Sequence, residues 1–290
     1  MGTSSPFGGA RNDRPFVPSW VEDPTGIGNG DDVGGGGDAH DGGDDGGTPG
    51  PGKPPLPPLG PAGRFTGPRA AFTSFARSGG TDRRGLGRAV SGYVRSSMGS
   101  PRRAAQRMST AAGGGAGLVR MLQAFRADGV VETLRRLNLA ALAGRPIEEI
   151  FAGLADYICP EGGSIDEGIA RDAFVETIAD LAAEGITDVD GLTSDQMTTI
   201  FELYVAHTIE ARICNDIGTK AVTMPTNPTA AQTVEDMLHD FIERGVADAV
   251  ASAGTNIQSL SPDDVRGFVD GVYTSAFEIL RAMGDQEANR

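Results

Sequence analysis

Hydrophobic residues recur at helical spacing along residues 128–284, and this is the clearest pattern in the sequence. Positions three and four apart lie on one face of an α-helix, so each such run predicts a helix with one buried side. The pattern predicts five or six helices that form one helical bundle. The principal apolar faces are Ile147–Leu154, Ile169–Leu181, Met197–Ile213, Val234–Val246 and Val265–Leu280.

Helix-start signals stand directly before these faces. Pro146 occupies the place of a first helical residue, where a missing N–H group costs nothing. Ser164–Glu167 and Thr193–Gln196 have the spacing of a capping box, in which two side chains bond free N–H groups of the first turn. Thr229 and Ser261 are the candidate caps of the last two helices.

The helical pattern is weaker in residues 64–127. Leu86, Val90 and Val94 recur at helical spacing, as does a later group around Leu118. Several glycines interrupt both groups, among them Gly113–Gly115, and each weakens a helix by about 1 kcal/mol relative to alanine. We expect short or conditional helices here, which become ordered against a partner or against the C-terminal helices.

Residues 1–63 contain few large apolar side chains and are rich in Gly, Asp and Pro. Such a segment buries too little surface to offset the entropy of ordering, so it is predicted to be a disordered acidic tail. As a random coil it would span about 45 Å. The predicted organisation is this tail, an Arg-rich segment over 64–127, a bundle over 128–284 and a frayed C-terminus over 285–290.

Composition supports an all-α fold, because aromatic residues are only 6% of the chain and β-sheets favour aromatic and β-branched side chains. The two cysteines, Cys159 and Cys214, are too few for a disulfide framework, which suggests a reducing, cytoplasmic location. No apolar run has the length of a signal peptide core or a membrane span.

The net charge of −14 divides unevenly along the chain. Residues 64–145 carry fifteen Arg against three acidic side chains, whereas both flanking parts are acidic. Aromatic residues such as Phe72, Phe75 and Tyr93 are interleaved with these arginines. Three interpretations remain: an acidic protein surface, nucleic acid, or pairing within the chain. The candidate contacts are Arg83, Arg84, Arg88, Arg95, Arg102 and Arg103.

No set of residues predicts catalysis, a metal ion or a cofactor. His207, Glu210 and Cys214 share one helical face, but the thiol and the imidazole are nearly two turns apart and a fourth zinc ligand is not evident. A buried, unreactive thiol is the simpler interpretation.

An acidic cluster and several glycine runs also have residue types found in catalytic and phosphate-binding sites. The acidic cluster of Glu161, Asp166, Glu167 and Asp172, which also contains Arg171, is best explained as a capped helix start. The glycine runs before residue 50 lack the strand and helix that a phosphate-binding loop needs.

Several stretches resemble the B component of the bacterial Qat anti-phage defence system. They include GTDRRGLGRAVSGYVRSS, VVETLRRLNLAALAGRPIEEIF, ICPEGGSIDEGIARDAFVETIADLAAEGIT and HTIEARICNDIGTKA. The resemblance covers roughly residues 70–225, together with the MGTS start. It implies a defence operon that also encodes an ATPase, a TatD-like nuclease and an enzyme similar to QueC, which activates a deazaguanine carboxylate with ATP.

The resemblance further implies that this chain is a non-catalytic acceptor to which the QueC-like enzyme attaches a deazapurine. Gly2 is the expected acceptor, because a small second residue permits removal of Met1 and exposes an α-amine. Myristoylation of the same glycine is disfavoured, since its motif requires Ser or Thr at position 6 and this chain has Pro6. Three alternatives remain: a nucleic-acid adaptor, a cryptic enzyme that depends on Cys214 or His207, and a purely structural subunit.

Overall fold

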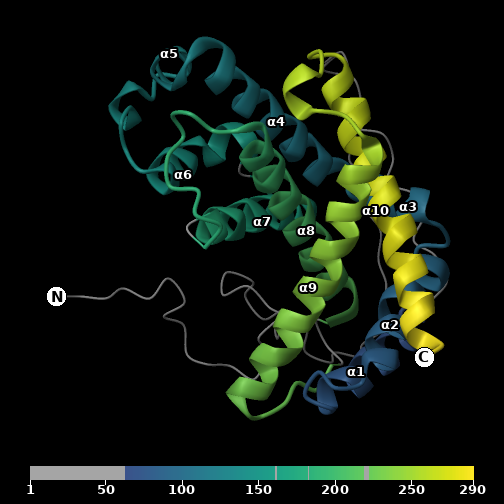
Figure 1. The fold of residues 1–290 in the computed structure, drawn as a ribbon. Coiled ribbons are helices and arrows are strands. Elements are labelled where there is room, and N and C mark those ends of the chain that lie inside the picture. The colour runs from purple at the N-terminus through teal and green to yellow at the C-terminus, as the bar shows by residue number, and fades with distance from the viewer. Residues whose placement is uncertain (1–62, 161, 182, 219–221) are drawn as a thin grey trace, which may run out of the picture.

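A computed structural model describes residues 63–160, 162–181, 183–218 and 222–290 of the chain (Figure 1). Within these residues all regular structure is helical and no strand occurs, so the predicted all-α fold is confirmed. The predicted acidic tail, its glycine runs and Gly2 lie outside the described residues. No helix in the described part is long and apolar enough to cross a membrane.

The helices follow one another with short connections. Three short elements also occur: a π-helical turn, η1, over Tyr93–Ser97, and 3₁₀ turns over Ala140–Leu142 (η2) and Ile257–Ser259 (η3). The α-helices are α1 Thr66–Arg77, α2 Arg83–Gly92, α3 Pro101–Arg107, α4 Ser109–Asp128, α5 Val130–Arg136, α6 Ile147–Ile158, α7 Ile165–Leu181, α8 Ser194–Gly218, α9 Pro228–Ala253 and α10 Asp264–Ala288.

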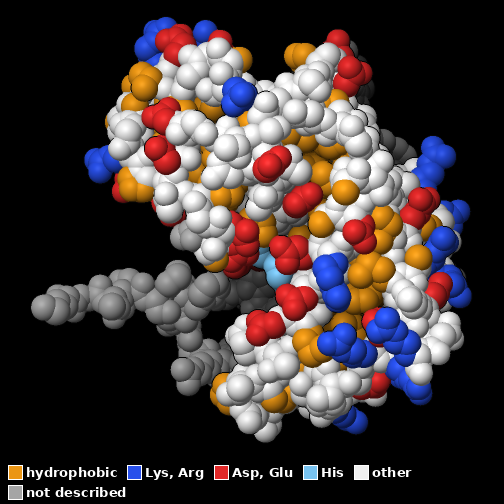
Figure 2. Space-filling view, in the orientation of Figure 1, with side chains coloured by type: hydrophobic (Ala, Val, Ile, Leu, Met, Phe, Trp, Pro, Cys, Tyr) orange, Lys and Arg blue, Asp and Glu red, His pale blue; other side chains and the backbone are white. Residues whose placement is uncertain are grey.

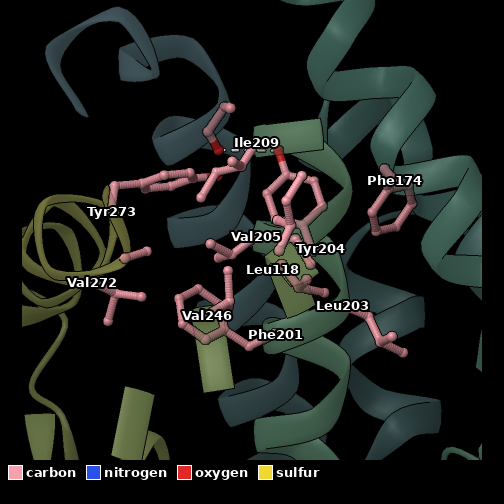
Figure 3. Packing of buried hydrophobic residues seen from close by; sticks show 14 of the residues in the cluster. Leu118, Phe174, Phe201, Leu203, Tyr204, Val205, Ile209, Val246, Val272 and Tyr273 are labelled. Atoms are coloured by element: carbon pink, nitrogen blue, oxygen red, sulfur yellow. Dashed lines mark hydrogen bonds between the residues drawn. The ribbon is translucent and has the colours of Figure 1, made fainter. Parts of the chain in front are cut away.

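Helix α8 lies at the centre of the fold and is buried on several sides. It packs between α7, α9 and α4, and side chains such as Phe201 reach α10, where Phe201 meets Phe268 (Figure 3). Tyr204 meets Phe174 of α7 edge to face, with ring centroids 6.3 Å apart, and its hydroxyl donates to the Ala111 carbonyl oxygen at 3.0 Å. Thr208 and Tyr273 join α8 to α10 through a buried hydroxyl pair 2.7 Å apart.

The basic N-terminal helices pack on the C-terminal ones, chiefly on α10. Two glycines allow a close approach: a Cβ atom on Gly284 would lie 2.7 Å from the Gly87 carbonyl oxygen, and one on Gly87 would lie 2.5 Å from that of Gly284. Only glycine permits α2 and α10 to pack this closely. The sequence predicts that residues 64–127 become ordered against a partner or against the C-terminal helices. In the structure they pack on the C-terminal helices.

Helix α4 is longer than the sequence suggests, because it continues through the three glycines that were expected to weaken it. A Cβ atom on Gly114 would lie 2.3 Å from the Tyr204 hydroxyl oxygen, and one on Gly115 would lie 3.3 Å from the same ring. These glycines leave room for the central tyrosine. Close packing against Tyr204 is therefore the contact that these glycines permit.

The two predicted capping boxes are observed. Ser164 and Glu167 bond reciprocally, with N···O distances of 3.0 and 3.2 Å, and Thr193 and Gln196 do the same. Pro146 is the N-cap of α6 and not its first helical residue, which is Ile147. Helix α10 begins at Asp264, whose N–H group donates to the Ser261 hydroxyl at 3.3 Å, and its N-cap is Asp263. The predicted cap Thr229 is wrong: Asn227 caps α9 by accepting from the Thr229 N–H group at 2.9 Å, and Pro228 is the first helical residue.

Two helix ends also differ from the prediction. Helix α9 continues past Val246 to Ala253, where Gly254 adopts a left-handed conformation and ends it. Helix α10 continues to Ala288, whereas the sequence predicts fraying from residue 285. Arg95 forms an ion pair with Asp285, which fastens this last turn to η1.

Candidate functional site: a basic face and a histidine–carboxylate cluster

The predicted arginine contacts lie at one end of the molecule, on α2, η1 and α3. Figure 2 shows Lys and Arg side chains gathered along the right-hand and lower side of the view, where these helices and α10 lie in Figure 1. All six residues are exposed. We use "basic face" for the five that lie on α2 and α3: Arg83, Arg84, Arg88, Arg102 and Arg103.

Only two of the six predicted arginine contacts have an acidic side chain within 4 Å among the described residues. Arg95 pairs with Asp285, and Arg88 lies 3.8 Å from Asp82. The Ser74 hydroxyl and the Gly85 N–H group donate to Asp82, and these bonds lower its carboxyl pKa. For Arg83, Arg84, Arg102 and Arg103, the described part of the chain provides no ion-pair partner within 4 Å. These four charges remain available to an external acidic group.

The aromatic residues near the basic face are part of the core. Phe72, Phe75 and Tyr93 are at most 3% exposed, so their rings are not accessible to nucleic-acid bases. Tyr93 donates to Asp216 of α8 at 2.9 Å, and burial raises its pKa well above the usual value. The basic face therefore offers charge without the accessible aromatic surface that single-stranded nucleic acids require.

The first described residues are attached close to the basic face. Ser97 donates to the Arg64 carbonyl oxygen at 2.8 Å, and Phe65 stacks on Tyr93 with centroids 6.1 Å apart. Arg69 of α1 donates to the carbonyl oxygens of Asp216 and Ile217 at 3.2 and 3.1 Å. The described chain consequently begins beside η1 and the C-terminal end of α8.

A second group of polar side chains lies where α7, α8 and α9 meet. His207 Nε2 lies 2.8 Å from Asp180 Oδ2, and His239 Nδ1 donates to Glu210 Oε2 at 2.7 Å. The two imidazole rings are in contact, with centroids 4.9 Å apart. We call Asp180, His207, Glu210 and His239 the histidine–carboxylate cluster; Figure 2 shows histidine at the surface among Asp and Glu side chains.

The cluster shifts the pKa values of its members in opposite directions. The hydrogen bond from His207 holds the pKa of Asp180 below its usual value. The hydrogen bond to Glu210 raises the pKa of His239 to about 9. Burial raises the pKa of the neighbouring Glu235 to about 7, and the Glu210 charge adds to this effect. Burial likewise raises the pKa of Glu176, to which Asp172 contributes.

Among the described residues, neither cysteine belongs to the group of possible ligands formed by Asp180 and the two histidines. Cys214 is buried and its thiol pKa is raised well above the usual value, because burial disfavours the thiolate. The Cys159 sulfur lies 3.6 Å from the Tyr204 hydroxyl oxygen, and burial raises its pKa to about 11. Neither thiol is activated for nucleophilic attack.

The acidic cluster at the start of α7 takes part in structural contacts. Asp166 pairs with Arg212 of α8, whose side chain is 3% exposed. Glu167 belongs to the observed capping box, and Arg171 pairs with Asp156 at 2.7 Å. Glu161 lies outside the described residues. These contacts join α6, α7 and α8.

Sequence analysis identified His207 and Glu210 but missed Asp180 and His239. Asp180 and His239 lie on other helices than His207, and the spacing of residues along one helix does not reveal contacts between helices. The one available signal is that His239, on the predicted helix after His207, lies four residues from both Glu235 and Glu243.

The fold and its sites define an all-α protein with a basic face at one end and a histidine–carboxylate cluster between three helices. The family described as Qat anti-phage system associated protein QatB matches residues 99–280, which extend from just before α3 into α10. The chain therefore belongs to the QatB family and is a component of an anti-phage defence system. No match was found among curated proteins or solved structures.

Proposed function

We propose that this chain is a non-catalytic scaffold that docks a QueC-like enzyme and presents the amine of Gly2 for attachment of a deazapurine. The observation that carries the docking step is the basic face, where four exposed arginines have no ion-pair partner in the described part of the chain. The position of the first described residues supports the rest: Arg64 and Phe65 contact η1, which links the two helices that carry these arginines.

The proposed reaction is an acylation of the Gly2 amine. The QueC-like partner activates the carboxyl group of the deazapurine with ATP, and the amine attacks the activated carbonyl carbon. An amide bond forms, the activating group leaves and the amine loses a proton. An α-amine has a pKa of about 8, against about 10.4 for lysine, so the unprotonated nucleophile is more abundant at the N-terminus. This chain supplies the nucleophile and the docking surface.

Neutralising the basic face is expected to weaken partner binding. The triple variant Arg84→Gln, Arg102→Gln, Arg103→Gln removes three exposed charges, each worth about 0.5 kcal/mol to an ionic contact, so affinity for the QueC-like enzyme falls about tenfold. The matched control is Arg135→Gln, Arg136→Gln on α5, where both arginines pair with Glu132. Calorimetry or biolayer interferometry at two salt concentrations provides the measurement.

Two results would contradict docking through this face. One is an unchanged affinity of the triple variant for the enzyme. The other is intact enzyme binding combined with a loss of salt-dependent DNA or RNA binding, which would favour the nucleic-acid adaptor. The same four exposed arginines support that second candidate, although the burial of the neighbouring aromatic rings weighs against it.

A further inference from the structure

We propose that Asp180, His207 and His239 form a binding site for Zn²⁺ or a similar divalent transition-metal ion. One oxygen of Asp180 and one ring nitrogen of each histidine lie within 4.8 Å of one another. The three residues come from α7, α8 and α9, so an ion bound there would join three helices that are separate in sequence.

The positions of these atoms are close to what a metal ion needs. Zinc ligands lie about 2.0–2.1 Å from the ion, which places two ligand atoms of a tetrahedral site about 3.3 Å apart. Asp180 Oδ2 and His207 Nε2 are already 2.8 Å apart. His239 must therefore approach by about 1.5 Å at most. Its side chain is 25% exposed and Asp180 is 41% exposed, so both have room for this adjustment.

The type of donor indicates the type of ion. Two imidazoles and a carboxylate suit zinc and neighbouring first-row metals, whereas Mg²⁺ and Ca²⁺ prefer oxygen ligands alone. Glu210 adds a feature common to metal-bound histidines, because a carboxylate on one ring nitrogen orients the ring for a ligand on the other. Glu210 Oε2 lies 2.7 Å from His239 Nδ1.

The surrounding charges also favour a dication. Glu176, Glu210 and Glu235 add acidic side chains on the same three helices. One oxygen of Glu235 is buried and has no hydrogen-bond partner among the described residues. A divalent cation would compensate this concentration of acidic groups.

Metal titration of the full-length, tag-free chain tests the proposal. Isothermal calorimetry with ZnCl₂ is expected to show one high-affinity site per chain. His207→Gln and His239→Gln should each weaken that site at least about tenfold. Zinc and cobalt should raise the melting temperature of the wild type, since ligands that bind only the folded state stabilise it, and Mg²⁺ should have no such effect. The matched control is His40→Ala, the chain's remaining histidine.

A wild-type chain without a stoichiometric zinc site would overturn the proposal. So would a site that both glutamine variants retain at wild-type affinity, or one that His40→Ala abolishes. Circular dichroism checks that each variant is folded. If a glutamine variant fails to fold, Asp180→Asn, which keeps the shape of the side chain and removes its charge, is tested against the same criteria.

Discussion

Replacing Gly284 by alanine is expected to destabilise the protein by about 2 kcal/mol, even though alanine is the better helix former. The added Cβ atom would lie 2.7 Å from the Gly87 carbonyl oxygen and 2.9 Å from the Ser91 backbone nitrogen. Both are backbone atoms, so a side-chain rotation cannot relieve the overlap and α2 must move away from α10. Urea denaturation monitored by circular dichroism measures the change in unfolding free energy.

The same helix contains its own control. Nothing lies within 4 Å of the Cβ position at Gly271, so Gly271→Ala is expected to gain the helix propensity of alanine, about 1 kcal/mol, without a clash. If Gly284→Ala lowers the unfolding free energy and Gly271→Ala raises it, the close approach of α10 to α2 is supported. Equal effects at positions 271 and 284 would contradict the packing of the basic helices described above.

Replacing Gly2 by leucine is expected to abolish phage protection. Glycine leaves the α-amine unhindered and its backbone free to enter a narrow active site, whereas a branched side chain next to the amine obstructs its approach to an activated carboxyl group. A large second residue also opposes removal of Met1. The measurement is a plaque assay. Cells that carry the whole operon with Gly2→Leu are expected to give as many plaques as cells without the operon.

The control for this variant is Gly8→Leu, which adds the same side chain to the same segment away from the amine. It is expected to protect as well as the wild type. Immunoblots confirm that both variants accumulate equally. Full protection by Gly2→Leu would contradict the acceptor role and would favour a purely structural subunit.

Local signals in the sequence predicted the helical part of the fold well. The capping pairs Ser164–Glu167 and Thr193–Gln196 predicted the starts of α7 and α8, because a cap needs only a few neighbouring residues. The Arg-rich segment was harder to predict. Its glycines weaken isolated helices, but Gly87 and Gly114 also permit close packing on α10 and α8, and propensity alone does not report such a contact.

The candidate sites show the same limit. On α2 the exposure of the arginines follows from helical spacing, since Leu86 and Val90 are buried while Arg83, Arg84 and Arg88 are exposed. The histidine–carboxylate cluster depends on Asp180, His207 and His239 from three helices, and no pattern within one helix predicts that they meet. The match of residues 99–280 to the QatB family shows membership in the defence system. The matched region includes α9 and most of α10, where individual sequence motifs resemble the family less closely.

Intact-protein mass spectrometry of the chain, purified from cells that express its native operon, tests the acceptor role most directly. We expect loss of Met1 and a mass increase equal to a deazapurine carboxylic acid less one water, located on Gly2 by fragmentation. The increase should disappear in Gly2→Leu and when the QueC-like partner is inactivated. An unmodified Gly2 amine in a strain where that partner is active and phage protection is intact would contradict the account.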